Sequence, residues 1–268
     1  MSQQDHGPLS NPASVINKPG DEGKIRLSKR MSELGLSSRR EADELIEKGW
    51  VFVDGVAVTE LGTKIFPNQK ITLNKNAQSE QSARVTVLIN KPLGYVSGQP
   101  EPGCVPAIQL VQPENLMQPS RRKWQVGHLK HLAPAGRLDI DSTGLLVMTQ
   151  DGRIAKQLIG ENSSVDKEYL VRVKGTLIDG GLELLNHGLS LDGVKLKQAK
   201  VEWQNEDQLH FTLWEGRNRQ IRRMCELVGL NVVALKRVRI GQVKLADLPV
   251  GQWRYLLDGE KFEGGFKN

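Results

Sequence analysis

The chain has 268 residues and carries 37 Lys and Arg against 31 Asp and Glu, a formal charge of +6 at pH 7. This excess of cations indicates an anionic partner. With only Cys104 and Cys225, the sequence has neither a disulfide framework nor a zinc cluster, as is usual in a reducing compartment. No apolar run approaches the ~18 residues of a membrane span, and the first residues do not resemble a signal peptide. We therefore expect a cytoplasmic protein with no membrane partner.

Composition divides the chain into four parts. Residues 1–22 are rich in Ser, Pro, Gly, Asn and Asp, which predicts a disordered tail. Residues 24–74 predict a small helix-helix-hairpin domain, and the polar, aperiodic stretch 75–83 predicts a linker. From 84 to 258, strand-like runs alternate with a few helical stretches. This second pattern predicts an α+β domain built on a mixed, mainly antiparallel β-sheet.

Local signals support the helix-helix-hairpin prediction. The second helix, within SSRREADELIEKG, has Ser37 or Ser38 as its N-cap, and Glu41 follows Ser38 at the spacing of a capping box. In WVFVDGVAV, an alternating strand pattern is interrupted by Asp54-Gly55, which is a strong hairpin dipeptide.

Four cations lie on the two N-terminal helices: Lys29, Arg30, Arg39 and Arg40. Two of them stand in the first turn of the second helix, where the helix dipole disfavours positive charge. The four form either an ordinary solvated face or a surface that contacts phosphates. The order RLSKRMSELGLSSRREADELIEKGWVFVDG resembles the alpha-L RNA-binding domain. That resemblance implies RNA binding but no chemistry.

The most informative segment is GRLDIDSTGLLVMTQDG, in which Arg137, Asp139 and Asp141 precede a buried apolar run. Taken alone, Asp139 is interpreted equally well as a turn residue paired with Arg137. Asp139 and Asp141 also have the spacing of two side chains on one strand face, which leaves open an acid/base pair or a metal site. Asp151-Gly152, at the end of the segment, is interpreted as a hairpin turn.

Four segments in order, NKPLGYVS, GRLDIDSTGLLVMTQDG, KEYLV and EGRNRQIRRM, closely resemble the pseudouridine synthases of the RsuA/RluB/RluE/RluF branch. The similarity extends over about residues 24–256. Within the branch, NRQIRRMCE and PVGQWRYL are most similar to the RluF type, which acts on large-subunit (23S) ribosomal RNA. The resemblance implies isomerisation of uridine to pseudouridine with neither a cofactor nor a metal.

The resemblance also assigns roles to residues at matching positions. It implies that Asp139 is the catalytic carboxylate, acting on the sugar at C1′ or by removing a ribose proton. Arg222 would keep that carboxylate ionised, because a desolvated carboxylate needs a cation within about 4 to 6 Å. Tyr169 would stack on the everted base. Arg137 would contact RNA near the vacated position, although an ion pair with Asp141 explains it equally well.

The remaining cations are predicted to contact RNA. Arg217, Arg219 and Arg223 are dense for a plain helix face, so we expect them to bind backbone phosphates. Segment 97–135 is longer and more basic than we expect for the branch, with Arg121, Arg122 and Lys123 beside Trp124. We hypothesise that it is an RNA-contacting loop.

The sequence therefore predicts a monomeric isomerase whose partner is ribosomal RNA. The RluF-type resemblance implies large-subunit RNA, with transfer RNA as a second candidate. Two alternatives stay open. One is a non-catalytic RNA-binding or ribosome-assembly protein on the same fold. The other is an RNA-directed glycosidase that uses Asp139 and Asp141.

Overall fold

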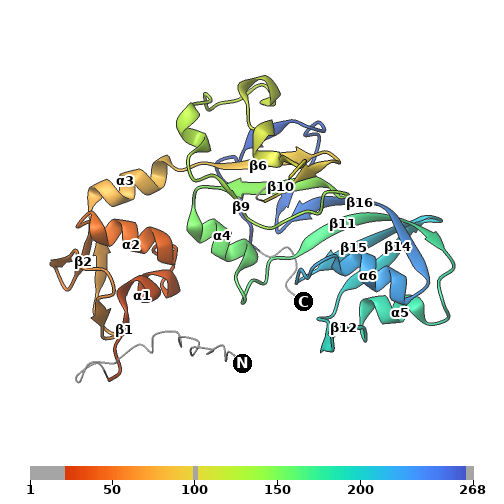
Figure 1. Cartoon of the computed structure of the whole chain (residues 1–268), viewed down its shortest axis with the longest axis horizontal. Coiled ribbons are helices and arrows are strands. Elements are labelled where there is room, and N and C mark those ends of the chain that lie inside the picture. The colour runs from red at the N-terminus through yellow and green to blue at the C-terminus, as the bar shows by residue number, and fades with distance from the viewer. Residues whose placement is uncertain (1–21, 99–101, 264–268) are drawn as a thin grey trace, which may run out of the picture.

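Two groups of elements follow one another along the chain and are joined by one helix (Figure 1). The computed structural model describes residues 22–98 and 102–263, so the predicted tail, up to residue 21, lies outside the described residues. The α-helices are α1 (Leu27–Glu33), α2 (Arg39–Glu47), α3 (Lys75–Ala83), α4 (Gly152–Ile159), α5 (Gly181–Asn186) and α6 (Gln220–Leu227). The 3-10 helices are η1 (Ala107–Leu110), η2 (Pro113–Asn115) and η3 (Val126–Leu129). The strands are β1 (Ile25–Arg26), β2 (Val51–Val53), β3 (Val56–Val58), β4 (Lys64–Ile65), β5 (Ile71–Leu73), β6 (Thr86–Lys91), β7 (Tyr95–Val96), β8 (Val105–Pro106), β9 (Ala133–Pro134), β10 (Thr143–Thr149), β11 (Lys167–Gly175), β12 (Ser190–Leu191), β13 (Val194–Lys195), β14 (Lys200–Asn205), β15 (Gln208–Leu213), β16 (Leu230–Ile240), β17 (Val243–Lys244) and β18 (Trp253–Tyr255).

The N-terminal domain has the predicted helix-helix-hairpin order. The Ser38 hydroxyl accepts from the Glu41 backbone N–H at 3.3 Å, and the Glu41 carboxylate accepts from the Ser38 N–H at 3.2 Å, so the capping box is confirmed. Asp54 and Gly55, between β2 and β3, have φ of 50° and 85°, as a two-residue hairpin with two positive φ angles requires. Strands β3, β2 and β5 form a small sheet. Helix α1 packs on α2, and side chains from both helices and from the strands form an apolar cluster within this domain.

The segment predicted as a linker forms helix α3. Its start is marked by Asn74, whose side-chain oxygen accepts from the backbone N–H of Ala77 at 2.9 Å. Within the helix only Ala77 and Gln81 are buried. Because so few of its side chains pack, the sequence has no apolar periodicity there, and the cap is the only local signal of a helix.

The second domain is built on a nine-stranded sheet with the order β14-β15-β11-β16-β10-β6-β18, with β9 beside β10 and β17 beside β16. The β10–β16 pair is parallel and the other pairs are antiparallel, so the predicted mixed, mainly antiparallel α+β fold is confirmed. Side chains alternate between the two faces: Val87 and Ile89 join one core cluster, and Leu88 joins the other. Helices α5 and α6 pack into the first cluster and α4 into the second.

The parallel pair β10–β16 requires a glycine where the two backbones meet. Gly144 has φ of +98°, and a Cβ atom at this position would lie 2.2 Å from the carbonyl oxygen of Arg237. Only a residue without a side chain permits this approach. Gly144, Arg237 and Tyr169 are register partners, so they lie side by side across β10, β16 and β11.

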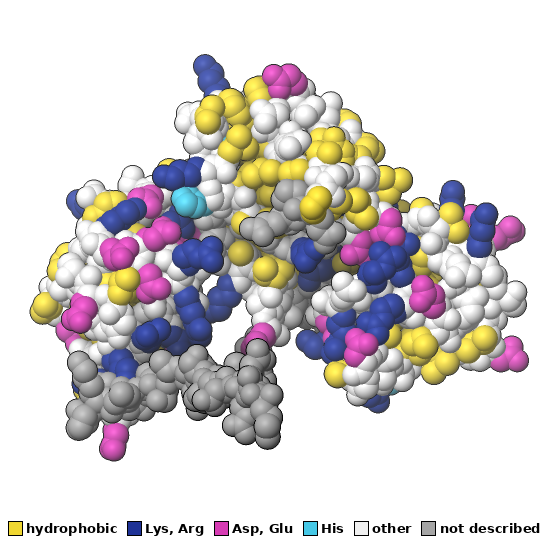
Figure 2. Space-filling view, in the orientation of Figure 1, with side chains coloured by type: hydrophobic (Ala, Val, Ile, Leu, Met, Phe, Trp, Pro, Cys, Tyr) yellow, Lys and Arg dark blue, Asp and Glu magenta, His cyan; other side chains and the backbone are white. Residues whose placement is uncertain are grey.

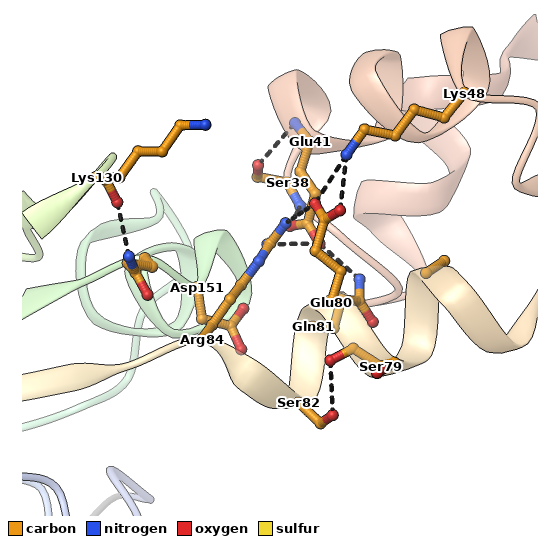
Figure 3. A network of polar contacts seen from close by, with 12 residues as sticks. Ser38, Glu41, Lys48, Ser79, Glu80, Gln81, Ser82, Arg84, Lys130 and Asp151 are labelled. Carbon is orange, nitrogen blue, oxygen red and sulfur yellow. Dashed lines mark hydrogen bonds and ion pairs between the residues drawn. The ribbon is translucent and has the colours of Figure 1, made fainter. Parts of the chain in front are cut away.

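A polar network joins the two domains (Figure 3). Glu41 of α2 is buried. Its carboxylate forms an ion pair with the Arg84 guanidinium at 2.7 Å and accepts a hydrogen bond from the Gln81 side-chain amide at 2.6 Å. Helix α4 abuts the same region, since a Cβ atom on Gly152 would lie 2.3 Å from the Cβ of Ser38. The orientation of the N-terminal domain is therefore fixed by buried polar contacts and by close backbone packing.

The interpretation of Asp151-Gly152 as a hairpin turn is wrong. Asp151 is the N-cap of α4, and its carboxylate accepts from the backbone N–H of Arg153 at 2.9 Å. The same carboxylate pairs with the Arg153 guanidinium at 2.6 Å. An Asp-Gly dipeptide suits both a turn and a helix start, and here the amphipathic stretch after it decides for the helix. Within residues 22–98 and 102–263, no helix is both long and apolar enough to cross a bilayer.

Candidate active site

A cleft of about 710 Å³ lies where the loop before β10, the start of β11 and the segment leading into α6 meet. The three residues predicted as catalytic, Asp139, Tyr169 and Arg222, all line it, and so do Arg137 and Arg219. The sheet order explains this convergence, because β16 separates β10 from β11 and α6 leads directly into β16. Segments distant in sequence therefore contribute to one cavity.

The loop that carries Asp139 is fixed on one side by a buried serine. The Ser97 hydroxyl accepts from the backbone N–H of Leu138 at 2.9 Å and donates to the carbonyl of the same residue at 2.7 Å. Two residues after Leu138, the backbone N–H of Gly94 donates to the carbonyl of Ile140 at 3.0 Å. Ser97 and Gly94 both belong to the NKPLGYVS run, so this run holds the loop that carries Asp139 in place.

Two arginines hold the loop from the other side. A buried guanidinium, that of Arg237, donates to the Arg137 carbonyl at 3.3 Å and to the Leu145 carbonyl at 2.7 Å. Arg222 donates to the Asp141 carbonyl at 2.8 Å. Such contacts remove backbone freedom around Asp139 before any substrate binds, which is the preorganisation that catalysis requires.

The ion pairs differ from the predicted arrangement. Within the described residues, Arg222 forms its ion pair with Asp141, at 3.1 Å, and none with Asp139. Arg219 approaches Asp139 most closely, at 3.8 Å, while also pairing with Asp141 at 3.1 Å. Arg137 is exposed and does not pair with Asp141. Asp141 thus fixes both guanidinium groups, and Arg219 takes the position beside Asp139 that was predicted for Arg222.

Burial and neighbouring charges shift the pKa values of two groups near the cleft, Asp141 and Lys91. Burial raises the pKa of Asp141, but the hydrogen bond from Arg219 and the charges of Arg222 and Arg219 outweigh it and hold the pKa below its usual value. Burial lowers the pKa of Lys91 to about 8, although Asp141 and Asp139 oppose the shift. The Lys91 ammonium donates to two carbonyl groups of its own loop, at 2.8 and 2.9 Å, and so shapes the NKPLGYVS run.

The other predicted RNA contacts in and just before α6, Arg217 and Arg223, differ in where they lie. Arg217 lines the cleft and lies 3.5 Å from Glu215. Arg223 does not line the cleft and pairs with Asp192 of the β12–β13 turn at 2.6 Å. Of the dense arginine run, Arg217 and Arg219 are therefore positioned at the mouth of the cavity.

The basic residues of the N-terminal domain are accessible to a ligand. Arg39 and Arg40 are exposed and form no ion pair with any described residue. Lys29 and Arg30 each lie within 4 Å of Glu33, on the surface of α1. Figure 2 shows Lys and Arg side chains on both sides of the open space between this domain and the second domain.

The described part of the basic segment 97–135 packs against the core of the second domain. The Arg122 guanidinium lies over the Tyr255 ring, 5.7 Å from its centre, and Trp124 packs half-buried against the core. Arg121 and Lys123 are exposed. The aromatic residues therefore anchor the segment, and the two flanking cations point their charge to solvent.

Sequence reasoning missed three residues of the site: Ser97, Lys167 and Arg237. Lys167 and Arg237 line the cleft although they are 8% and 2% exposed. Each lies in a run with the pattern of an ordinary strand. The one signal in the sequence that could have identified them is a charged residue among apolar neighbours. Ser97 left no signal, because a serine after a strand is common.

Comparison with known families decides the identity of the fold. A model described as RNA pseudouridylate synthase matches residues 85–227, and a model of the S4 domain matches residues 25–71. The chain belongs to the RNA pseudouridylate synthase family. Members of this family are isomerases, so the resemblance found in the sequence motifs is confirmed.

Individual relatives agree with the family. The dual-specificity RNA pseudouridine synthase RluF of Escherichia coli (strain K12) is 36% identical over 241 residues, covering 89% of this chain and 78% of that protein. The ribosomal large subunit pseudouridine synthase B of Bacillus subtilis (strain 168) is 35% identical over 242 residues, covering 88% and 93%. A crystal structure of a pseudouridylate synthase superposes with a TM-score of 0.59 at 25% identity, covering 87% and 96%.

The contacts of Arg222 and Arg219 predict different effects on stability. Arg222→Met leaves the Asp141 carbonyl without its donor in a buried setting, so we expect the free energy of unfolding to fall by about 2 to 4 kcal/mol. Arg219→Met removes a more exposed ion pair and should cost less than about 1 kcal/mol. Urea denaturation of both variants measures the difference. Equal losses, or a larger loss for Arg219→Met, would contradict the arrangement of contacts described above.

Proposed function

We propose that this protein isomerises a specific uridine of large-subunit ribosomal RNA to pseudouridine, acting as a monomer in the cytoplasm. Relatives named as large-subunit pseudouridine synthases and as RluF support a ribosomal substrate. Transfer RNA is a second candidate substrate, in line with the dual specificity in the RluF name. The observation that carries the proposal is the cleft in which Asp139, Tyr169 and Arg219 meet.

In the proposed mechanism, Asp139 is the catalytic carboxylate. Its side chain is 36% exposed and opens into the cleft, so an everted nucleotide can reach it. The Arg219 guanidinium lies 3.8 Å from this carboxylate, beside the oxygens that would attack C1′ or accept a ribose proton. The contacts that fix the loop backbone hold Asp139 ready without requiring a rearrangement on binding.

Tyr169 is proposed to receive the target base. A uridine can react only outside its stack, which costs a few kcal/mol of unstacking and unpairing. Stacking on an aromatic ring returns about 1 to 3 kcal/mol per base. Tyr169 is largely buried in the sheet yet lines the cleft, so its ring is held rigidly at the cavity wall.

The surrounding cations are proposed to bind the RNA backbone. The S4 domain supplies Arg39 and Arg40, with Lys29 and Arg30 beside them, and the mouth of the cleft supplies Arg137 and Arg217. Arg223 is proposed as a phosphate contact that exchanges its partner Asp192 for RNA. Because the two domains are joined by a buried polar network, we expect these groups to keep a fixed arrangement on the two sides of the open space between the domains.

Two alternatives are weaker. A glycosidase would use Asp141 as a second carboxylate, but this residue is engaged by Arg219 and Arg222, each at 3.1 Å. A non-catalytic RNA-binding protein would not need a loop around Asp139 in which each backbone carbonyl from residue 137 to residue 141 accepts a hydrogen bond.

The mechanism predicts a selective loss on replacing the carboxylate. Asp139→Asn should abolish pseudouridine formation in large-subunit RNA while changing RNA affinity less than about threefold, because the amide keeps the shape but cannot act as a nucleophile or base. Nucleoside analysis of the treated RNA measures the product. Free uracil from the unaltered protein would indicate a glycosidase instead. Absence of any product from the unaltered protein on ribosomal and transfer RNA would indicate the non-catalytic alternative.

The basic segment predicts a salt-dependent contribution to binding. The double variant Arg121→Ala/Lys123→Ala should weaken RNA binding and lower the slope of log affinity against log salt by about 1.4, which is roughly 0.7 for each lost phosphate contact. Arg122 is left in place because it packs on Tyr255. The matched control is Lys195→Ala/Lys200→Ala, two exposed lysines toward the β14 edge, opposite β18. An unchanged slope, or the same change in the control, would reject the proposed contact.

A further inference from the structure

Two buried cations in the wall of the cleft lack a counter-ion. Lys167, at the start of β11, and Arg237, on β16, are 8% and 2% exposed, and both line the cavity. Within the part of the chain that the structure describes, neither forms an ion pair with a carboxylate. Burying an unpaired charge is costly, so stability alone does not account for two of them in the wall of one cavity.

Only main-chain oxygens hold these two cations. The Lys167 ammonium donates to the Val165 carbonyl at 3.1 Å, which occupies one of its three N–H groups. Of the Arg237 guanidinium, Nε and Nη1 donate to carbonyls, whereas Nη2 is buried and has no hydrogen-bond partner. Asp166, the residue before Lys167, is committed to Arg239 at 2.6 Å.

The electrostatic setting of Lys167 is consistent with an uncompensated charge. Burial lowers its pKa to about 8, the charges of Arg237 and Lys197 add to this, and the charge of Asp166 opposes it. At neutral pH the amine is therefore still mostly protonated. The cleft wall thus presents positive charge with spare hydrogen-bonding capacity.

We propose that Lys167, supported by the charge of Arg237, binds a carbonyl oxygen of the target uracil and stabilises the negative charge that the base carries when it leaves the sugar. This inference rests on the proposed function and adds a residue to it. Lys167 contacts the substrate, and Arg237 acts through its field and through its hold on the loop carbonyl of Arg137.

The reaction itself requires such a group. When the C1′–N1 bond breaks, its electron pair goes to the uracil ring and spreads onto O2 and O4. This is true whether Asp139 attacks C1′ or removes a ribose proton. The ring then uses a pair to form the C5–C1′ bond. On the first route this displaces the Asp139 oxygen from C1′, whose bonding pair returns to the carboxylate. On the second route Asp139 first returns the proton to C2′ of the C1′=C2′ double bond, and C5 adds at C1′. On both routes C5 loses its proton to water and N1 gains one. A fixed ammonium beside a ring oxygen stabilises the intermediate without transferring a proton itself.

The position of Lys167 favours the base over a phosphate as its ligand. Tyr169, two residues along the same strand, has the same 8% exposure and lines the same cavity, and it is the proposed platform for the base. Phosphates remain near solvent, where Arg137 and Arg219 stand exposed at the mouth. Because Lys167 is buried as deeply as Tyr169, we expect its ammonium to face the base that stacks on the Tyr169 ring.

The test compares Lys167→Met, Lys167→Gln and the unaltered protein in single-turnover formation of pseudouridine on ribosomal RNA. The rate should fall at least about 100-fold in both variants, the usual loss when one donor to a developing anion is removed. RNA affinity, measured in an Asp139→Asn background so that no turnover occurs, should change less than threefold. The melting temperature of Lys167→Met should stay level or rise, because an unpaired buried charge is replaced by an apolar chain.

Lys174→Met is the matched control, since Lys174 lies on the same strand but is exposed, and it should keep its rate. Rates within threefold of the unaltered protein in both Lys167 variants would overturn the inference while leaving the proposed function standing. Loss of RNA affinity in parallel with rate would identify a phosphate contact and also overturn it. If Lys167→Met fails to fold, the Gln variant decides. No pseudouridine from the unaltered protein would instead refute the proposed function.

Discussion

The site depends on one constraint, the fixing of the main chain around Asp139. Every carbonyl from residue 137 to residue 141 accepts a hydrogen bond, and the donors come from different parts of the fold: β16, the NKPLGYVS run, the loop itself and α6. A loop held in this way cannot move its carboxylate without breaking contacts in several elements at once. The nine-stranded sheet and its Gly144 contact serve to bring these donors together.

Charge is distributed in the cleft by depth. Asp139 faces the exposed Arg219 near the mouth, Asp141 pairs with Arg219 and with the buried Arg222, and buried cations without counter-ions lie in the wall. A substrate that enters with its phosphates at the rim and its base inside meets positive charge at both ends, with the carboxylate between them. This arrangement matches a reaction in which the sugar becomes electron-poor while the base becomes electron-rich.

The sequence predicted the fold and several of the residues that line the cleft, but it predicted less well which of these residues contact one another. Capping and turn signals at Ser38 and Asp54-Gly55 are local, so they predicted the N-terminal domain correctly. The pairing of Arg222 with Asp141 depends on how far α6 is rotated against the loop, which no local pattern encodes. The helix over 75–83 was missed because it buries almost nothing. Lys167 and Arg237 were missed because charge within a strand pattern suggests an exposed edge, not a cavity wall.

The central claim is that a carboxylate held in this loop converts a uridine of ribosomal RNA. The most direct measurement is a map of pseudouridines in the ribosomal RNA of cells that contain this protein and of otherwise identical cells that lack it. We predict that at least one defined position in the large-subunit RNA loses its pseudouridine when the protein is absent. Identical maps of ribosomal and transfer RNA, in cells shown to express the protein, would contradict the account.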